Sequence, residues 1–314
     1  MNTNYCMTEV ILLVDVTLLG CGGSIPLKDR WLTSCLIRYE GKSVLIDCGE
    51  GTQIALKSAG YTFKPIDVIC FTHYHADHIS GLPGFLLSMG NAGRTEPLEL
   101  IGPHGLAKTV NALRVIAPEI PFEIKYTEIS GAEDTFNVGP FVISAYKVLH
   151  AVTCYGYRIE IPRCGKFDVN RAIALGLPKN LWGVLQNGAD VEFDGKIYVP
   201  QDVLGPDRRG ISVAYCTDTR PVERMKTLAA DADLFICEGL YGDPEKQSKT
   251  SEKCHMTYTE AARIAKESNP KCMWLTHYSP AMTDPEEFLG VAREIFPETY
   301  CGFDGKTTSL KFEE

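Results

Sequence analysis

The chain has 314 residues, of which 45% are hydrophobic and 23% charged, and its formal net charge is −9. This composition is that of a folded globular protein and excludes a disordered or fibrous chain. The negative charge argues against attraction of the whole molecule to nucleic acid, so an anionic substrate would have to be held by a local basic patch or a metal. At about 150 residues per domain, the length predicts one large domain or two.

The longest apolar run starts at Val10 and is interrupted by Asp15. Because a bilayer-spanning helix needs roughly 20 apolar residues, we expect no transmembrane helix and no membrane partner. The first basic residue is Lys28, so the positive region of a secretory signal is missing, and we expect a cytoplasmic protein. The twelve cysteines contain no C-x-x-C pair and are predicted to be reduced, mostly buried thiols rather than disulfides or a zinc ribbon.

In chain order, short apolar runs alternate with helical patterns and predict a strand-rich α/β fold in which meandering sheets are covered by helices. A tight turn at Glu40-Gly41-Lys42 is expected to join the second and third strands. The predicted strands are 16–20, 35–39, 43–47, 67–71, 98–102, 122–126, 141–149, 156–161, 211–216, 233–237 and 272–276, and the predicted helices are 51–59, 78–89, 106–116, 258–267 and 285–295.

One segment differs in charge from the rest of the chain. Residues 161–188 carry four basic side chains against only Asp168, a net charge of +3, and they are rich in Gly, Pro and Asn. This pattern predicts either a basic arm or a solvated connection with incidental charge. The basic residues are Arg163, Lys166, Arg171 and Lys179.

The most informative string is T-H-Y-H-A-D-H at residues 72–78, between a predicted strand and a predicted helix. On extended chain, His73 and His75 point the same way, whereas Asp77 and His78 fall at the helix start. Four potential ligands within six residues are too many for one tetrahedral ion with an open position, so they predict two adjacent metal ions. Imidazole with carboxylate favours Zn²⁺, with Mn²⁺ or Fe²⁺ as alternatives.

Further ligands are expected at the ends of other predicted strands. His150 and His277 each end a strand, and Asp218 ends another and has two oxygens with which to bridge two metals. These three complete a set of seven ligands: His73, His75, Asp77, His78, His150, Asp218 and His277. His104 lies in a G-P-H-G turn before a helix and is interpreted as structural.

These motifs resemble the ribonuclease Z family, the tRNA 3′-end processing endonucleases of the metallo-β-lactamase superfamily. The resemblance runs from about Val16 to the C-terminus and implies a four-layer αβ/βα metallo-β-lactamase sandwich with a small inserted arm. It implies a single domain over residues 1–314, with the arm at 161–207. Besides the metal motif, the matching strings are LGCGGSIP at 19–26, DCGEGTQ at 47–53, GLPG at 81–84 and TDTR at 217–220.

The resemblance also implies roles for single residues. His73, His75 and His150 would hold one Zn²⁺, Asp77, His78 and His277 the second, and Asp218 would bridge them. Asp77 would in addition orient the attacking water, and Glu238 with His255 would relay a proton to the leaving group. The family strings around these two residues are altered, to Cys237-Glu238-Gly239-Leu240 and His255-Met256-Thr257.

The substrate implied by the resemblance is precursor tRNA, cleaved to remove its 3′ trailer. Lys28 and Arg30 lie in a loop that matches the family's P-x-K-x-R-N string with Trp31 in place of Asn. The arm would add Arg163, Lys166, Arg171 and Lys179, although its Gly-Pro-rich tip is reduced here to residues 177–182. Family resemblance further implies a homodimer.

Three other functions are compatible with parts of the sequence. A small-molecule hydrolase of the same superfamily would act on simple phosphodiesters or (thio)esters. A flavodiiron-type redox protein would need Glu where His75 stands. A non-catalytic RNA-binding relative would have no need of the complete ligand set.

Overall fold

The computed structural model describes residues 12–313, which form two compact units: residues 12–160 with 212–311, and residues 161–211 with the C-terminal residues from 312. No helix in this part of the chain is long and apolar enough to cross a membrane. The expectations about an N-terminal leader and about Cys6 fall on residues outside the described range. The cysteines within it are free thiols, most of them buried.

The first sheet of the larger unit contains seven strands in the order β16-β1-β2-β3-β4-β5-β6. β16, β1, β2 and β3 pair antiparallel, and β3, β4, β5 and β6 pair parallel. The hairpin between β2 and β3 turns at Glu40–Gly41, both with positive φ, as predicted. The strands are β1 (Leu13–Gly20), β2 (Ser34–Tyr39), β3 (Lys42–Ile46), β4 (Ile66–Cys70), β5 (Leu98–Gly102), β6 (Ile124–Glu128) and β16 (Thr307–Lys311).

The second sheet also contains seven strands, in the order β15-β14-β13-β12-β9-β8-β7. β12 to β15 pair parallel, and β7, β8 and β9 pair antiparallel. The strands are β7 (Glu133–Val138), β8 (Phe141–Val148), β9 (Cys154–Arg163), β12 (Arg208–Cys216), β13 (Leu234–Glu238), β14 (Met273–Thr276) and β15 (Thr299–Cys301).

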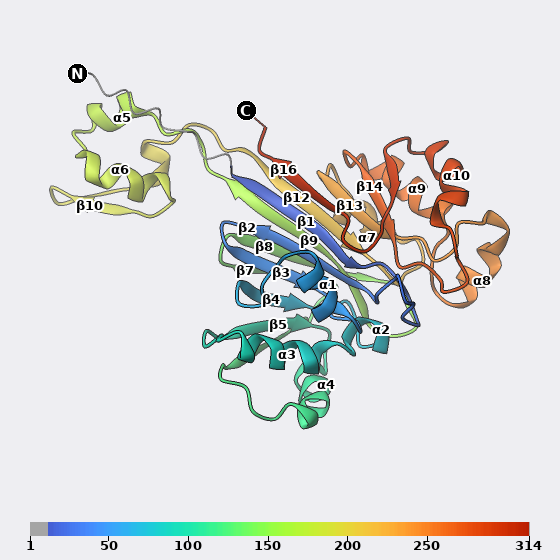
Figure 1. Cartoon of the computed structure of the whole chain (residues 1–314). Helices are drawn as coiled ribbons and strands as arrows, with labels where there is room; N and C mark the ends of the chain where they lie inside the picture. The colour runs from blue at the N-terminus through green and yellow to red at the C-terminus, as the bar shows by residue number, and fades with distance from the viewer. Residues whose placement is uncertain (1–11, 314) are drawn as a thin grey trace, which may run out of the picture. The chain divides into compact units, whose positions relative to one another are not determined.

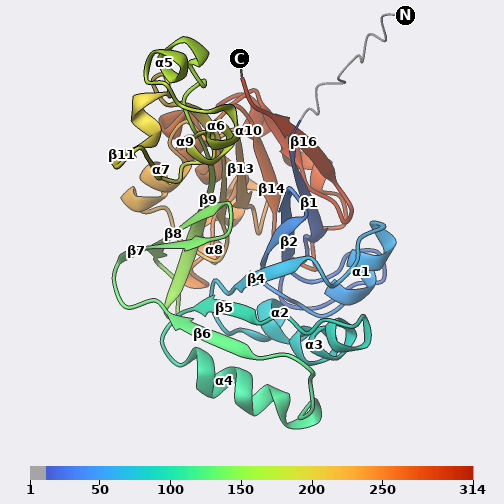
Figure 2. The ribbon, with the colours of Figure 1, turned by 90° about the vertical axis from the view of Figure 1, so that its left-hand side faces the viewer.

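Helices cover one face of each sheet (Figures 1 and 2). Leu56, Phe85 and Val110 from three of them pack on the first sheet, and a second cluster joins another set of helices to the second sheet. The first set is α1 (Thr52–Ser58), α2 (Ala76–Ile79), α3 (Leu82–Asn91), α4 (Leu106–Leu113) and η1 (Arg114–Ile116). The second set is α7 (Glu223–Ala229), η3 (Pro244–Lys246), α8 (Gln247–Glu252), α9 (Tyr258–Ser268), η4 (Pro285–Phe288) and α10 (Leu289–Arg293).

The other faces of the two sheets pack against each other. Within β4, Ile69 belongs to the helix-facing cluster, whereas Val68 and Cys70 on the opposite face are also fully buried. Tyr157 of β9 donates a hydrogen bond from its hydroxyl to the carbonyl oxygen of Phe71, directly after β4, at 2.6 Å. The predicted four-layer αβ/βα sandwich is therefore confirmed.

Some elements differ from the sequence prediction. The helix expected over residues 78–89 is split into α2 and α3 at Gly81, whose N–H donates to the Cys48 carbonyl oxygen at 2.9 Å instead of to the preceding turn. The close approach requires glycine, since a Cβ there would lie 2.2 Å from the Gly49 carbonyl oxygen. The sequence does not predict β7, β15 or β16, and all three are edge strands. An edge strand is less buried than a central one, so its sequence need not contain a continuous apolar run.

The smaller unit has its own apolar core. Ala172, Leu185 and Val203 are fully buried there, and Phe167 and Trp182 pack against them. The segment is therefore a folded unit, and its interpretation as a basic arm rather than a connection with incidental charge stays a prediction. Its elements are α5 (Val169–Ala174), α6 (Lys179–Gln186), β10 (Val191–Phe193), β11 (Lys196–Tyr198) and η2 (Pro200–Asp202).

Candidate metal centre

The histidine motif lies where β4 ends and α2 begins. Phe71 directly follows the strand, and Thr72 and His73 come next and are fully buried. His75 is still extended, with φ −65° and ψ 152°, and serves as the N-cap of α2, so that Asp77 and His78 are in the helix. The chain thus changes from period two to helical geometry within the motif, which directs its four side chains to two neighbouring points.

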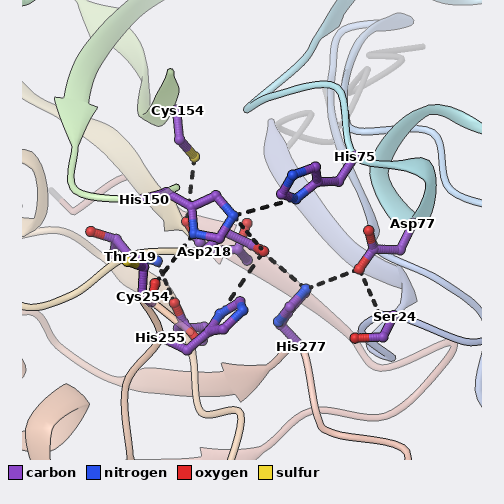
Figure 3. A network of polar contacts seen from close by, with 12 residues as sticks. Ser24, His75, Asp77, His150, Cys154, Asp218, Thr219, Cys254, His255 and His277 are labelled. Atoms are coloured by element: carbon purple, nitrogen blue, oxygen red, sulfur yellow. Dashed lines mark hydrogen bonds and ion pairs between the residues drawn. The ribbon is translucent and has the colours of Figure 1, made fainter. Parts of the chain in front are cut away.

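All seven predicted ligands meet at this point, although they come from four segments of the chain. Figure 3 labels five of them: His75, Asp77, His150, Asp218 and His277. Within each of three overlapping groups, the potential ligand atoms lie within 4.8 Å of one another. The groups are His73 with His75, His150 and Asp218; Asp77 with His78 and His277; and Asp218 with His255 and His277.

Asp218 stands at the centre of the cluster. Its Oδ1 lies 3.2 Å from His78 Nε2 and 3.1 Å from His277 Nε2. Its Oδ2 lies 3.8 Å from both His73 Nε2 and His150 Nε2. Each carboxylate oxygen therefore faces a different pair of imidazoles, which is the arrangement that a bridging ligand requires.

Several atoms of the cluster are buried without a hydrogen-bond partner. They include the Nε2 atoms of His73, His78 and His277 and the Oδ1 atom of Asp218. A buried polar atom without a partner costs free energy, and nitrogen and carboxylate lone pairs that face one another repel. A divalent cation would satisfy them together, so the donor set fits a divalent metal site.

Asp47 contacts the imidazole of His78 through Nδ1, the ring nitrogen that does not face Asp218. Its fully buried carboxylate accepts hydrogen bonds from Thr72 N (2.8 Å), Thr72 Oγ1 (2.9 Å) and His78 Nδ1 (2.8 Å). Because a carboxylate only accepts, the proton of neutral His78 is placed on Nδ1 and Nε2 is left bare toward Asp218. This role of Asp47 is not predicted from the sequence; the signal that could have found it is an acidic residue at the end of a predicted buried strand.

The electrostatics of the cluster favour the ligating protonation states of His73, Asp77 and Asp218. Burial lowers the pKa of His73 to about 2, helped by the neighbouring His78, so this imidazole is neutral. Burial would raise the pKa of Asp77, but the neighbouring imidazoles of His277, whose Nε2 lies 3.5 Å from Asp77 Oδ2, and of His78 outweigh it and hold the pKa below its usual range. The pKa of Asp218 is likewise held well below its usual value by the surrounding histidines, against the effect of burial. Burial would lower the pKa of His78, but the carboxylates of Asp218 and Asp47 outweigh it and raise this pKa, so a metal would have to displace a proton from His78.

Glu238 and His255 form a pair beside the cluster. Glu238 ends β13, is fully buried, and has Oε2 3.0 Å from His255 Nδ1. Its carboxylate also accepts hydrogen bonds from the backbone N–H groups of Thr219 (2.5 Å) and Met256 (3.3 Å). Burial by itself would lower the pKa of His255, but the charge and hydrogen bond of Glu238 outweigh it and raise the pKa to about 9. His255 can therefore carry a proton at neutral pH.

Comparison with known proteins is consistent with this geometry. A family model described as a beta-lactamase superfamily domain matches residues 203–278, and one described as anti-Pycsar protein Apyc1 matches residues 14–147. Ribonuclease Z of Lachnospira eligens is 54% identical over 302 residues, covering 96% of this chain and 99% of its own. The chain belongs to the ribonuclease Z family. Ribonuclease Z of Clostridium acetobutylicum is 48% identical, again with 96% of this chain and 99% of its own covered.

Solved structures show the same fold. The short form of human tRNase Z matches with a TM-score of 0.70 at 23% identity, covering 95% of this chain and all of its own. The metallo-beta-lactamase fold protein YhfI of Bacillus subtilis matches with a TM-score of 0.69 at 22% identity, with the same coverage. The ribonuclease Z resemblance inferred from the sequence is thus confirmed.

The predicted substrate-binding residues of this ribonuclease Z chain lie outside the metal cluster. Lys28 is exposed, whereas Arg30 donates to the Met282 carbonyl oxygen at 2.8 Å and lies over the Tyr278 ring. The side chain of His104 is 94% exposed, pairs with a glutamate and is not part of the cluster.

The four basic arm candidates are all in the smaller unit. Lys166 is exposed there, and Arg171 contacts Asp168 at 3.4 Å and donates to the Leu204 carbonyl oxygen. The side chain of Arg163 lies over the ring of Phe312, and the side chain of Lys179 lies over that of Trp182. Three of the four therefore also contribute to packing within this unit.

Proposed function

We propose that this ribonuclease Z family member is a metal-dependent endoribonuclease that hydrolyses a phosphodiester bond at the 3′ end of precursor tRNA and so removes the trailer. The observation that carries the proposal is the Asp218-centred cluster, with its buried imidazole nitrogens that have no hydrogen-bond partner, beside the Glu238–His255 pair. A binding protein or a structural protein would not need a cluster of lone pairs together with a poised proton donor.

We infer that the cluster holds two Zn²⁺ ions, although its oxygen and nitrogen donors also suit Mn²⁺ or Fe²⁺. Bound ions of this kind supply hydroxide at neutral pH and offset negative charge on the phosphoryl group. In the proposed assignment, one ion is held by His73, His75 and His150, the other by Asp77, His78 and His277, and Asp218 contacts both.

The remaining chemistry belongs to side chains of the chain itself. Asp77 is oriented by a hydrogen bond from the backbone N–H of Ser24 to its Oδ2 at 2.6 Å, and would orient the attacking water or accept its proton. His255, held by Glu238, would protonate the O3′ atom as the bond from phosphorus to O3′ breaks. The products are then a 3′-hydroxyl on the tRNA and a 5′-phosphate on the trailer.

Substrate binding would use basic side chains on two parts of the chain. Lys28 and Arg30 would contact phosphates from the loop after β1, and the arm at 161–207 would contribute Arg163, Lys166, Arg171 and Lys179. The compact unit at 161–211 supports an arm inserted into a single metallo-β-lactamase domain over residues 1–314. Because such contacts release counterions, the affinity for tRNA should fall as salt rises. We further propose a cytoplasmic homodimer.

In the decisive experiment, the bound metal of the purified protein is measured first. Its cleavage of a 3′-extended tRNA precursor and of a chromogenic phosphodiester is then measured in parallel. His75→Ala and Asp218→Ala should lose bound metal and cleave neither. His255→Ala should keep its metal and lose about 10²- to 10⁴-fold in tRNA cleavage. Cleavage of the chromogenic compound alone by the native protein would overturn the tRNA assignment in favour of a small-molecule hydrolase.

A further inference from the structure

Arg220 lies two residues after Asp218 and reaches the segment that carries His255. Its guanidinium donates to the His255 carbonyl oxygen at 2.5 Å and to Thr250 Oγ1 at 3.3 Å. It also forms a two-pronged pair with the carboxylate of Glu260. The arginine side chain is 18% exposed and that of Glu260 is 6% exposed, so this ion pair is largely shielded from solvent.

Glu260 is itself fixed in place. It occupies the first turn of α9, where its carboxylate accepts the backbone N–H of Thr257 at 3.0 Å in a capping box. Gln247 Nε2 donates to the same carboxylate at 3.2 Å. A carboxylate with these partners presents a rigid acceptor pair, and the planar guanidinium of Arg220 matches it in two-pronged fashion.

The main chain at this point holds a second loop of the site. The Arg220 N–H donates to the Leu149 carbonyl oxygen at 2.9 Å, and the Leu149 N–H donates to Thr219 Oγ1 at 3.0 Å. Leu149 precedes His150, whose Nδ1 lies 3.3 Å from the carbonyl oxygen of Cys254. The segment 217–220 therefore ties together the loops that carry His150 and His255, which face each other across Asp218 in Figure 3.

The backbone before His255 needs such support. Cys254 has φ +58°, in the left-handed region that a residue with a side chain occupies at a cost in free energy. The hydrogen bond from the His255 N–H to the Thr250 carbonyl oxygen, at 2.8 Å, and the bond from Arg220 to the His255 carbonyl oxygen hold the two peptide groups on either side of the His255 Cα. Loss of the second bond would allow the imidazole to move relative to Glu238 and the cluster.

We propose that Arg220, clamped by Glu260, is a positioning residue for the reaction: it fixes the His255 main chain so that the imidazole meets the departing O3′ atom. This inference rests on the proposed function, in which His255 is the proton donor. If the ion pair were purely structural, its removal would lower the free energy of unfolding and would affect the cleavage of every substrate equally. If Arg220 positions His255, its replacement should lower the activity only on substrates whose leaving group must be protonated.

The test compares Arg220→Lys and Arg220→Met with a matched control, Arg224→Met, which removes an exposed arginine paired with Glu133 on the surface. Each protein is assayed for bound metal and for kcat and KM on precursor tRNA. Hydrolysis of bis(p-nitrophenyl) phosphate is measured in parallel, because nitrophenolate leaves without protonation.

We expect Arg220→Met to lower kcat on tRNA by about 10²-fold, the lower end of what a general acid contributes, with KM, bound metal and nitrophenyl ester hydrolysis little changed. Arg220→Lys should be intermediate, since lysine keeps the charge but not the two-pronged geometry. Added to His255→Ala, the Arg220→Met change should cost little more, because the group that it positions is already absent.

Equal losses on both substrates, loss of metal, or multiplicative effects in the double variant would overturn the proposal. If Arg220→Met does not fold, Glu260→Gln retains the arginine, weakens the clamp, and should show the same substrate selectivity to a smaller extent. If His255→Ala itself affects both substrates equally, the proton-donor assignment of the proposed function fails instead. The two failures are thus distinguishable.

Discussion

Replacement of Asp47 by Asn tests whether the Asp47 carboxylate determines which ring nitrogen of His78 carries the proton. The backbone at Asp47 has φ +57°, a left-handed conformation that Asn tolerates well, so the fold should be retained. The amide keeps one acceptor oxygen, which can still serve Thr72 N, but places an NH₂ group where Oδ2 accepts His78 Nδ1 at 2.8 Å. The Nδ1 atom can then only accept, and the proton moves to Nε2.

A protonated Nε2 cannot bind a metal, and this atom faces Asp218 Oδ1 at 3.2 Å in the centre of the cluster. For the variant to bind metal, either the hydrogen bond between the new amide and His78 Nδ1 must be broken, or His78 must keep its proton on Nδ1, where it faces the amide NH₂ group. Such partners behind metal-binding histidines are worth about 10- to 100-fold in metal affinity. At about 1.4 kcal/mol per factor of ten, Asp47→Asn should weaken binding at the affected ion by about 1.4–2.8 kcal/mol.

The assay is competition for Zn²⁺ with a chromophoric chelator at pH 7, with far-UV circular dichroism to verify folding. Asp67→Asn is the matched control. Asp67 also belongs to the first sheet, in β4, but its carboxylate accepts hydrogen bonds from Lys42 Nζ and the Ser43 N–H, away from the site. The control should retain native affinity. A folded Asp47→Asn protein whose Zn²⁺ affinity stays within twofold of native would refute the tautomer argument.

Three further outcomes are expected. Gly23→Ala should lower metal affinity and activity at least about tenfold, because its Cβ would lie 2.7 Å from His277 Cε1, whereas Gly183→Ala, with open space around it, should leave both unchanged. Arg94→Met should cost at least about 3 kcal/mol in urea unfolding, since a 2%-exposed guanidinium that donates to four carbonyl groups is lost; a cost below about 1 kcal/mol would contradict this. Burial would raise the pKa of Glu260, but the hydrogen bond and charge of Arg220 outweigh it and lower this pKa from its usual value of 4.5. The ionised carboxylate therefore stabilises the fold above pH 4.5, and this stabilisation is lost as the pH falls through the lowered pKa. Glu260→Gln should therefore reduce stability at pH 7 and flatten the acid side of the unfolding profile, and an unaltered profile would count against the pair.

The central strands and the metal ligands could be predicted from sequence for the same reason. Strands such as β4 and β14 are largely buried on both faces, so their apolar runs are nearly continuous. His73, His150 and His277 each stand one to three residues after the end of a strand, namely β4, β8 and β14. Edge strands such as β16 alternate half-buried and exposed residues and give a weak signal. The ends of buried strands are therefore both the most predictable positions in the chain and the positions that carry the chemistry.

The supporting residues could not be predicted in this way. Asp47 and Arg220 both lie in strings that the sequence analysis quotes, but which nitrogen or carbonyl each one contacts depends on loops 30 or more residues away. Arg30 shows the reverse case, a basic residue predicted for substrate whose guanidinium is partly engaged by Met282 and Tyr278.

By itself the sequence determined the family and the sandwich fold, because the motifs that resemble ribonuclease Z are short continuous strings. It also indicated the candidate ligands, because each stands in the histidine motif or near the end of a predicted strand. Only the tertiary structure decided which atoms face one another, including the two sides of the Asp218 carboxylate and the clamp on the His255 main chain. Hydrogen-bond and ligand geometry depends on tenths of an ångström between segments that are distant in sequence, and those distances exist only after the sheets have packed.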